Sequence, residues 1–594
     1  MLFCQNINKN KILMNPLRLT KRSLLAAGSG LLPALLLLSP GETMAQEAID
    51  AMRLARPDMK GTARFMSMGG AFGALGGDLT SFSYNPAGIG VYRSHELGIT
   101  VDLDAQKSSM KSAGGEFTHS NTPFLLNNIG GVLTLKFNSK VVPNINFGFT
   151  YNRTASFNRV YGGGLGSINT SMTNWMAGIA NSNGLTVGDV SYNGTFNPYN
   201  PNDGGIAAPW IDILAYQSYL INPEGDPDNP TWQGQFGGPS TQNGVTVPGT
   251  TGSAYATVEE KGGIDAFNIA FGGNFGNLVY WGMDFDISSL NYTRNTLYSE
   301  SLDNAYVESD QGIERTSSNW NLKNWYNVSG TGFTYKLGVI LRPIQEFRIG
   351  VAFHTPTYYS LTQQFQASTE CYYNGNRQPI TNYTNSDRNG YYEPGYSDFR
   401  FVSPWKVMVS AAGVLANRFI ISADYQWDLA SKMHFKDPAY DSYYYYDYFP
   451  YSDGYGFGAS ANSYAPVNES IKTYYSDIHT LRLGAEFRVT NKFSIRAGYS
   501  NVSSGVRQSA ADGREYIYTA GTQTDYSFDD ATNYVTAGLG YRSNGFYADF
   551  AYVYKHTKST WHAFPDDPDS SVRTPSATLG LTSNQFILSL GYKF

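Results

Sequence analysis

Segments of about ten residues in which apolar and polar side chains alternate recur along this chain, and they constrain its fold more than any other feature. Alternation with a period of two places the apolar side chains on one face of an extended strand. The clearest example is Gln585–Phe594, and Leu481–Val489 and Phe419–Trp427 repeat its pattern. A strand that turns apolar side chains outward to lipid and polar or small side chains inward to a lumen has this sequence.

Fourteen segments fit the pattern, and the connections between them alternate in length. Short turns such as Asn277-Leu278 and Ser543-Asn544 follow the even-numbered segments, and long loops follow the odd-numbered ones, the largest at about 153–264. We therefore predict an all-β fold, a 14-stranded antiparallel transmembrane β-barrel with short periplasmic turns and long outer loops. A soluble β-sandwich, the alternative, gives no reason for loops that alternate in length. The predicted strands lie near 97–104, 131–138, 145–152, 265–276, 279–289, 333–342, 346–354, 404–413, 417–427, 480–489, 493–500, 534–541, 545–555 and 585–594.

The composition favours the same fold class. Charged and aromatic residues each make up 15 % of the 594 residues, and 45 Tyr and 62 Gly make the chain rich in strand formers and poor in helix formers. The mean hydropathy of −0.33 argues against a helical membrane protein. The net charge of −6 gives no support to nucleic-acid binding. The two cysteines, Cys4 and Cys371, exclude a disulfide framework and a cysteine-based zinc site.

The first 45 residues have the features of an export signal. Arg18, Lys21 and Arg22 form a basic region, Ser23–Ser39 is apolar, and Thr43-Met44-Ala45 offers a small-x-Ala cleavage site. Met1 and Met14 are both candidate starts. An uncleaved anchor is the alternative to a cleaved signal, although the apolar run is short for a spanning helix. We predict three parts: a signal peptide at 1–45, an N-terminal hatch or plug at 46–96, and a barrel at 97–594.

Residues 46–96 are rich in glycine and contain Asn85-Pro86-Ala87-Gly88. Glycines permit tight turns with positive φ, and an Asn-Pro pair starts a turn because proline restricts the residue before it. A compact segment of small residues can fit inside a barrel wide enough to need filling. We predict that Asn85, Pro86 and Ala87 form a fixed turn that holds the hatch; movement of this turn on ligand binding is the alternative.

The motif Ala63-Arg64-x-x-Ser67-Met68-Gly69-Gly70-Ala71, followed by Asn85-Pro86-Ala87-Gly88, resembles the N-terminal hatch of the FadL/TodX outer-membrane transporters. The terminal Phe594 also resembles the signal used by the outer-membrane assembly machinery. The resemblance covers the whole mature chain. It implies a plugged 14-stranded barrel that carries long-chain fatty acids or other hydrophobic molecules, with substrate leaving sideways through the wall. The loops are larger and richer in Tyr than that family's pattern.

Two groups of residues are candidates for ligand binding. Trp175 and Trp210 belong to an apolar part of the largest loop, which could capture a hydrophobic solute or simply pack as a lid. Five arginines are predicted to point into the periplasmic part of the lumen, where unpaired cations are costly. They either pair with carboxylates such as Glu486 and those of the hatch, or hold a substrate carboxylate by a bidentate contact. These arginines are Arg342, Arg348, Arg418, Arg488 and Arg496.

Other patterns give weaker signals. The Tyr-rich loop around Tyr443–Tyr448 could bind sugars or partners or serve as surface decoration. The acidic stretch Glu224–Asn229 is interpreted as an ordinary turn rather than a calcium loop. The seven histidines are scattered, and none stands out as an axial haem ligand. We expect no metal site, no cofactor and no enzymatic activity.

We predict an importer of hydrophobic small molecules, most plausibly long-chain fatty acids, that works by passive diffusion. The alternatives are a receptor for hemin or another ligand, and a surface adhesion or structural barrel. The expected location is the outer membrane of a Gram-negative bacterium, and the expected partners are membrane lipid, lipopolysaccharide and the hydrophobic ligand. We expect no nucleic-acid partner. A monomer is the favoured oligomeric state, and the functional weight comes from the family resemblance rather than from site chemistry.

Overall fold

The computed structural model describes most of the chain after the predicted signal peptide. The described residues are 47–193, 196–200, 208–242, 245–309, 312–373, 380–387, 389–416, 418–438, 464–519, 521–568 and 570–594. The signal peptide with Cys4 and the Tyr-rich loop at 443–455 lie outside them. None of the helices in the described ranges is both long enough and apolar enough to cross a membrane.

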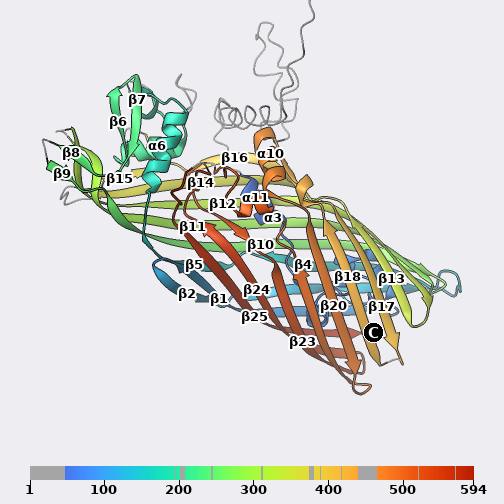
Figure 1. Cartoon of the computed structure of the whole chain (residues 1–594). Coiled ribbons are helices and arrows are strands. Elements are labelled where there is room, and N and C mark those ends of the chain that lie inside the picture. The colour runs from blue at the N-terminus through green and yellow to red at the C-terminus, as the bar shows by residue number, and fades with distance from the viewer. Residues whose placement is uncertain are drawn as a thin grey trace, which may run out of the picture. The chain divides into compact units, whose positions relative to one another are not determined.

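The strands form a closed antiparallel barrel, which confirms the predicted fold (Figure 1). Each barrel strand pairs with the next along the chain, and the last pairs with the first in a register that sets Lys593 opposite Glu96. The fourteen barrel strands are β1 (Glu96–Ser112), β3 (Phe124–Lys136), β4 (Asn144–Ser156), β10 (Thr251–Phe275), β11 (Val279–Ser309), β12 (Gly312–Ile344), β13 (Phe347–His354), β17 (Lys406–Leu415), β18 (Phe419–Asp428), β20 (Ile478–Arg488), β21 (Phe493–Val502), β23 (Thr532–Ser543), β24 (Phe546–His562) and β25 (Ser576–Lys593).

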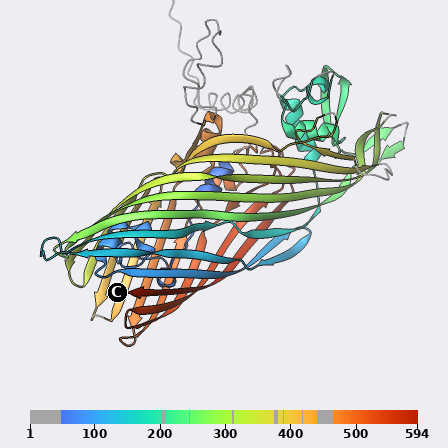
Figure 2. The same ribbon diagram turned by 180° about the vertical axis from the view of Figure 1, so that it is seen from behind.

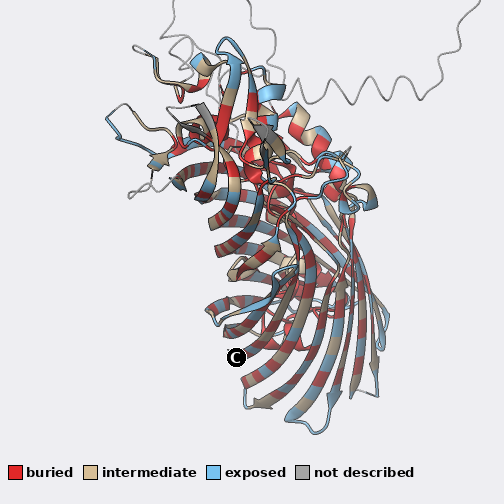
Figure 3. Ribbon diagram, turned by 60° about the vertical axis from the view of Figure 1, so that its left-hand side comes forward, coloured by how far each residue is buried: buried red, intermediate tan, exposed pale blue. Residues whose placement is uncertain are grey.

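Burial alternates along each strand, as the banded ribbons of Figure 3 show. The exposed outward set is apolar over a zone that we call the apolar belt. It includes Ile99, Leu133, Phe149, Ile269, Phe285, Val339, Val351, Ile421, Leu483, Ile495, Leu539, Phe550 and Leu588. The buried inward set is largely polar and includes Asp102, Asn128, Asn268, Asp284, Asp424, Arg482, Glu486, Arg496, Asp549 and Ser589. A barrel that is apolar outside and polar inside is suited to lipid surroundings.

Three neighbouring strands continue far beyond the belt. β10, β11 and β12 have 25, 31 and 33 residues, whereas a membrane strand needs about 9–11. The prediction that a loop at 290–332 joins the strands at 279–289 and 333–342 is therefore wrong. β11 and β12 stay paired through this region, from Val279↔Leu341 to Ser309↔Gly312. β14 (Tyr358–Tyr373) and β16 (Gly395–Val402) widen this part. We call it the sheet extension; it comprises residues 251–263, 289–309, 312–332, 358–373 and 395–402.

Residues 47–95, here called the N-terminal segment, lie on the inner side of the strands, where Figure 2 shows them in blue. Lys60 Nζ lies 2.9 Å from an Asp102 carboxylate oxygen on β1, and Arg64 Nε lies 3.0 Å from Glu486 on β20. The segment thus bonds to opposite parts of the wall through polar groups of the lumen. Its elements are α3 (Ala48–Ala55), α4 (Ala63–Ser67), α5 (Ser81–Tyr84) and the 3₁₀ helix η1 (Pro86–Val91).

The remaining elements belong to the long connections on one side of the barrel, which we call the loop side. They are β2 (Gly115–Asn121), β5 (Arg159–Ser167), α6 (Met172–Ser182), α7 (Val187–Val190), α8 (Trp210–Gln217), β6 (Ile221–Asp226), β7 (Asn229–Gly234), β8 (Ser240–Gln242), β9 (Val245–Val247), β15 (Ile380–Tyr383), η3 (Ala430–Lys432), β19 (His434–Lys436), α10 (Ala465–Tyr474), α11 (Gln508–Ala511) and β22 (Tyr526–Asp529).

Candidate ligand site and wall opening

Helix α3 places two arginines on the loop side of the lumen. The helix begins with a reciprocal capping box between Glu47 and Asp50, which satisfies free backbone N–H groups. Six of its eight residues are buried, so the helix is held by its apolar face. Arg53 lies in its last turn, and Arg56 follows its end directly before Pro57. Both arginines line a cavity of about 150 Å³ between the N-terminal segment and the wall, which we call the lumen cavity.

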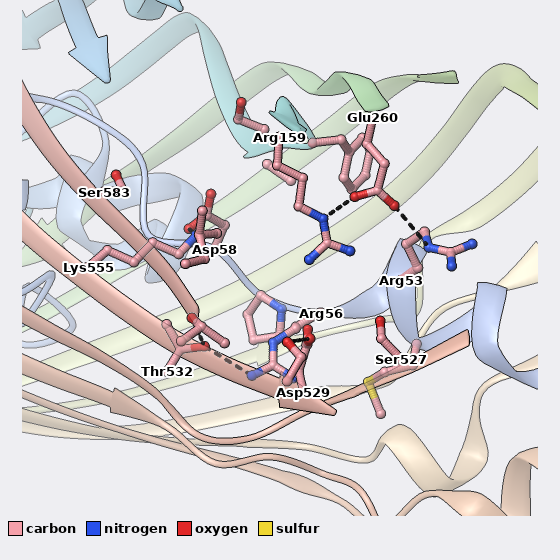
Figure 4. Close-up of a pocket in the computed structure, with 18 of the residues that line it drawn as sticks. Arg53, Arg56, Asp58, Arg159, Glu260, Ser527, Asp529, Thr532, Lys555 and Ser583 are labelled. Atoms are coloured by element: carbon pink, nitrogen blue, oxygen red, sulfur yellow. Dashed lines mark hydrogen bonds and ion pairs between the residues drawn. The ribbon is translucent and has the colours of Figure 1, made fainter. Parts of the chain in front are cut away.

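Glu260 on β10 is the centre of the charges around this cavity (Figure 4). It accepts a short contact from Arg159 Nε on β5 and lies 3.8 Å from Arg53 Nε and 3.5 Å from Arg294 Nε. Tyr292 donates its hydroxyl to the same carboxylate at 2.7 Å. Three arginines from different parts of the chain therefore converge on one buried carboxylate.

The other charges at the cavity are paired as well. Lys555 Nζ lies 2.8 Å from Asp58, and Arg56 Nη1 lies 3.6 Å from Asp529. Burial alone would raise the pKa of Asp58, but Lys555 and Lys60 hold that pKa below its ordinary value. The site is therefore a cavity in which closely matched charges lie beside apolar side chains.

A gap in the strand ladder lies beside this cavity. The pairing of β3 with β4 ends at Asn128↔Asn152, so among the described residues Phe124–Leu126 pairs with β1 but not with β4. Above this gap β2 and β5 lie side by side (Figure 1), joined by a contact of 3.1 Å between His119 Nε2 and the Gly162 carbonyl oxygen. The hydrogen-bond ladder between β3 and β4 therefore stops, and further towards the loop side β2 and β5 close the wall again.

A second cavity of about 320 Å³ lies at this gap. It is lined by residues of β2 and β5, by Pro123 before β3 and by Glu259–Lys261 of β10. Asn158 and Glu260 line both this cavity and the lumen cavity. We call the second cavity the wall window, because it lies where the ladder is missing and shares residues with the lumen.

The predicted hatch motif lies against the inner wall. Asn85 is the N-cap of η1: its Oδ1 accepts the N–H of Ala87 at 3.1 Å, and its Nδ2 donates to the Gly73 carbonyl at 2.6 Å. Asn85, Pro86 and Ala87 are all buried. A Cβ on Gly338 of β12 would lie 1.9 Å from Asn85 Oδ1, so the turn and the strand approach closely. None of the three residues lines the lumen cavity or the wall window.

The five arginines predicted to point into the periplasmic part of the lumen are dispersed. Arg496 is buried between Glu486 at 2.7 Å and Asp549 at 2.6 Å, and Arg488 lies 3.7 Å from Glu486. Arg348 donates to the Leu75 carbonyl at 2.7 Å. The remaining two lie at turns: Arg342 donates to the Gln345 carbonyl at 3.4 Å, and Arg418 is exposed between β17 and β18. None of the five lines either cavity.

The two tryptophans of the largest loop pack inside the loop-side structure. Trp210 in α8 is 6 % exposed, with its ring centroid 5.1 Å from that of Phe365 on β14. Trp175 in α6 is half-buried, and its ring centroid lies 6.3 Å from that of Phe564. Neither tryptophan lines the lumen cavity or the wall window.

The residues that line the lumen cavity were not among the predicted ligand-binding residues; they include Arg53, Arg56, Arg159 and Lys555. A capping box before an amphipathic run, Glu47–Ala55, was a signal for α3 and its arginines. Nothing in the sequence brings Arg159 to Glu260, because 100 residues separate them and only strand pairing sets them opposite each other. In the described part of the chain no three His, Cys, Asp or Glu side chains form a group that could hold a metal ion.

Fold and site together define a class: a transmembrane β-barrel whose lumen holds its own N-terminal segment and a polar cavity next to a gap in the wall. No family model and no curated protein matches the sequence. Among solved structures, the chain is similar to a Pseudomonas aeruginosa FadL homologue, at 11 % identity and a TM-score of 0.46, over 91 % of this chain and 100 % of that one.

Two toluene transporters also match. Pseudomonas putida TodX is 12 % identical with a TM-score of 0.41, over 90 % of this chain and 99 % of that one. Ralstonia pickettii TbuX is 13 % identical with a TM-score of 0.38, over 90 % and 98 %. FadL and TodX are also the names of the family that the N-terminal motifs resemble.

Proposed function

We propose that this protein carries hydrophobic small molecules across the outer membrane of a Gram-negative bacterium, without covalent chemistry and as a monomer. The short turns then face the periplasm and the loop side faces outward. Long-chain fatty acids are the first substrates to test, on the family resemblance of the N-terminal motifs.

The observation that carries the proposal is that the lumen cavity and the wall window share Asn158 and Glu260. The N-terminal segment acts as a plug, because its polar bonds to opposite parts of the wall obstruct a straight path through the barrel. A molecule that enters from the loop side then reaches the lumen cavity and leaves sideways through the window. The window lies at the height of Phe124, whose exposed side chain belongs to the edge of the apolar belt.

The test is uptake of labelled oleate by whole cells with and without the gene, with hemin as a competitor. We expect uptake that depends on the gene and is indifferent to hemin. Asn158→Trp fills the space between the two cavities and is expected to reduce uptake at least fivefold. Asn319→Trp, on the exposed face of the sheet extension, is the matched control and leaves uptake unchanged.

Surface expression and the folded gel mobility of each variant are measured alongside uptake. Absence of gene-dependent uptake by a folded, surface-exposed protein contradicts fatty-acid import. Competition by hemin favours a hemin receptor instead. Uptake that survives Asn158→Trp contradicts the sideways route while leaving the transported class in place.

A further inference from the structure

The polar groups of the lumen cavity that remain unpaired are both donors and acceptors. Arg159 bonds to Glu260 through Nε, and no described residue hydrogen-bonds its two terminal amino groups. Ser527 Oγ likewise has no hydrogen-bond partner among the described residues, and Gln106 Oε1 is buried without one. Gln106 is oriented by its own amide, which donates to Asp104 at 2.8 Å. A ligand that both donates and accepts hydrogen bonds can therefore bond to all three: the Arg159 amino groups, Ser527 Oγ and Gln106 Oε1.

The charges of the cavity leave no cation free for an ionised ligand. Its lining has four basic side chains and four acidic ones, and each basic one has a carboxylate partner. The three arginines around Glu260 do not create a surplus, because Arg53 also pairs with Asp50 and Arg294 with Asp525. The basic side chains of the lining are Arg53, Arg56, Arg159 and Lys555, and the acidic ones are Asp58, Asp104, Glu260 and Asp529. An added carboxylate would have to break one of these pairs or stay uncompensated, and both are costly where water is scarce.

The size and the apolar part of the lining suit one six-membered ring. The volume is about 150 Å³, and an apolar cavity of that size in another protein accepts benzene. Here part of the lining is polar, so the space can hold water in the absence of ligand. Ligand hydroxyls can take over the hydrogen bonds of that water. The rings of Tyr475 and Phe528 lie edge to face at 6.4 Å in the same lining and offer apolar surface to the faces of a ligand ring.

The geometry points to an uncharged polyhydroxylated ring, such as the sugar of an alkyl or aryl glycoside, as the group that the lumen cavity recognises. This inference rests on the proposed function and narrows it: among the amphiphiles that the proposed route carries, those with an uncharged hydroxylated head group bind the lumen cavity more tightly than fatty acids. The two parts of such a molecule then have different places: the hydroxylated ring occupies the lumen cavity, and the apolar part fits the route through the wall window to lipid. An amphiphile with a neutral head group then binds better than one with a carboxylate.

The inference is tested with the full chain in lipid nanodiscs, by calorimetric titration with phenyl β-D-glucoside and, in parallel, with benzoate. Both probes have the same aromatic ring and differ in the group that the cavity would bind. We expect saturable glucoside binding at least tenfold tighter than benzoate binding. Gln106→Leu and Ser527→Ala each remove one unpaired polar atom and are expected to weaken glucoside binding about fivefold.

Matched controls are available on the exposed face of the sheet extension: Gln364→Leu and Ser360→Ala repeat the same substitutions away from the cavity and leave binding unchanged. Benzoate binding as tight as glucoside binding overturns the inference. So does glucoside binding that ignores Gln106→Leu and Ser527→Ala in proteins of native gel mobility. Oleate uptake that depends on Asn158 without any glucoside binding overturns the inference and leaves the proposed function standing. Glucoside binding at the cavity without gene-dependent uptake supports the cavity's ligand class and contradicts the proposed function.

Discussion

The apolar belt and the sheet extension are parts of the same strands, yet their outward faces are opposite in character. Along β10 the outward side chains in the belt include Phe267, Ile269 and Phe275, whereas those in the extension include Glu259 and Lys261. The ladder to β11 continues without a break between them. Backbone hydrogen bonding is thus the same in both parts. Only the polarity of the outward side chains differs, and it indicates lipid outside the belt and water outside the extension.

The inward faces differ as well. At belt depth the inward face is largely polar and carries ion pairs to the N-terminal segment, such as Arg64 with Glu486. In the extension the inward face carries large apolar side chains, among them Trp320, Leu322 and Phe365, beside buried charges such as Glu260. The extension therefore has a polar outward face and a partly apolar inward face, whereas the belt has an apolar outward face and a polar inward one. Four predictions, from the largest expected effect to the smallest, test this contrast.

The first prediction compares an ion pair in each part. Glu486→Gln leaves Arg64 and Arg496 without their shared carboxylate in the lumen, and we expect a loss of about 3–5 kcal/mol in the free energy of unfolding. Glu370→Gln removes the partner of Lys323 on the exposed face of the extension, with an expected loss below about 1 kcal/mol. Urea unfolding in lipid vesicles measures both, and equal losses would contradict the contrast.

The second prediction places one charge on two outward positions of the same strand. Ile269→Arg puts a guanidinium into lipid, at an expected cost of about 2–4 kcal/mol. Tyr255→Arg, 42 % exposed on the extension, should change the free energy of unfolding by less than about 0.5 kcal/mol. A substantial cost at Tyr255, measured in the same vesicles, would mean that the belt reaches higher than its apolar residues indicate.

The third prediction concerns how closely the N-terminal segment fits the inner wall of the belt. Gly338→Ala brings a methyl group against Asn85, and we expect a loss of about 1–3 kcal/mol, because overpacking forces the backbone to move. Gly413→Ala on β17 is the control, since its Cβ would approach no atom closer than 4.0 Å. A native melting temperature for Gly338→Ala would show that the segment is held loosely.

The fourth prediction concerns a buried acid on the loop side. Asp212 in α8 is fully buried, neither of its carboxylate oxygens has a partner among the described residues, and burial raises its pKa well above the ordinary value. The folded state therefore binds a proton more readily than the unfolded state, so the stability of α8 is greatest below a pH of about 3.9 and falls as the pH rises towards the folded pKa.

Hydrogen exchange of α8, corrected for the intrinsic pH dependence, should become faster as the pH rises from about 3.9, the ordinary carboxylate pKa, towards the raised pKa of Asp212. Asp212→Asn cannot ionise and should make this local stability independent of pH. Global unfolding of the barrel should change little in either case. An identical pH dependence in the variant would show that another group controls α8.

The strand count and the belt could be predicted from sequence. Lipid outside the barrel and a polar lumen inside it require apolar and polar residues to alternate along every spanning strand. All fourteen predicted segments overlap barrel strands. The sheet extension could not be predicted in the same way. The expected strands ended at membrane length, and alternation between 290 and 332 identifies neither the outward face nor the solvent that it meets.

The sequence by itself determined the class of fold, because each strand alternates apolar side chains, which face lipid, with polar or small side chains, which face water or protein. Only the tertiary structure decided which charges meet. Arg53, Arg159 and Glu260 come from a lumen helix and from two strands whose register sets them together. Charged side chains carry no local signal of their partners, because their pairing depends on distances that exist only after the barrel has closed around its N-terminal segment.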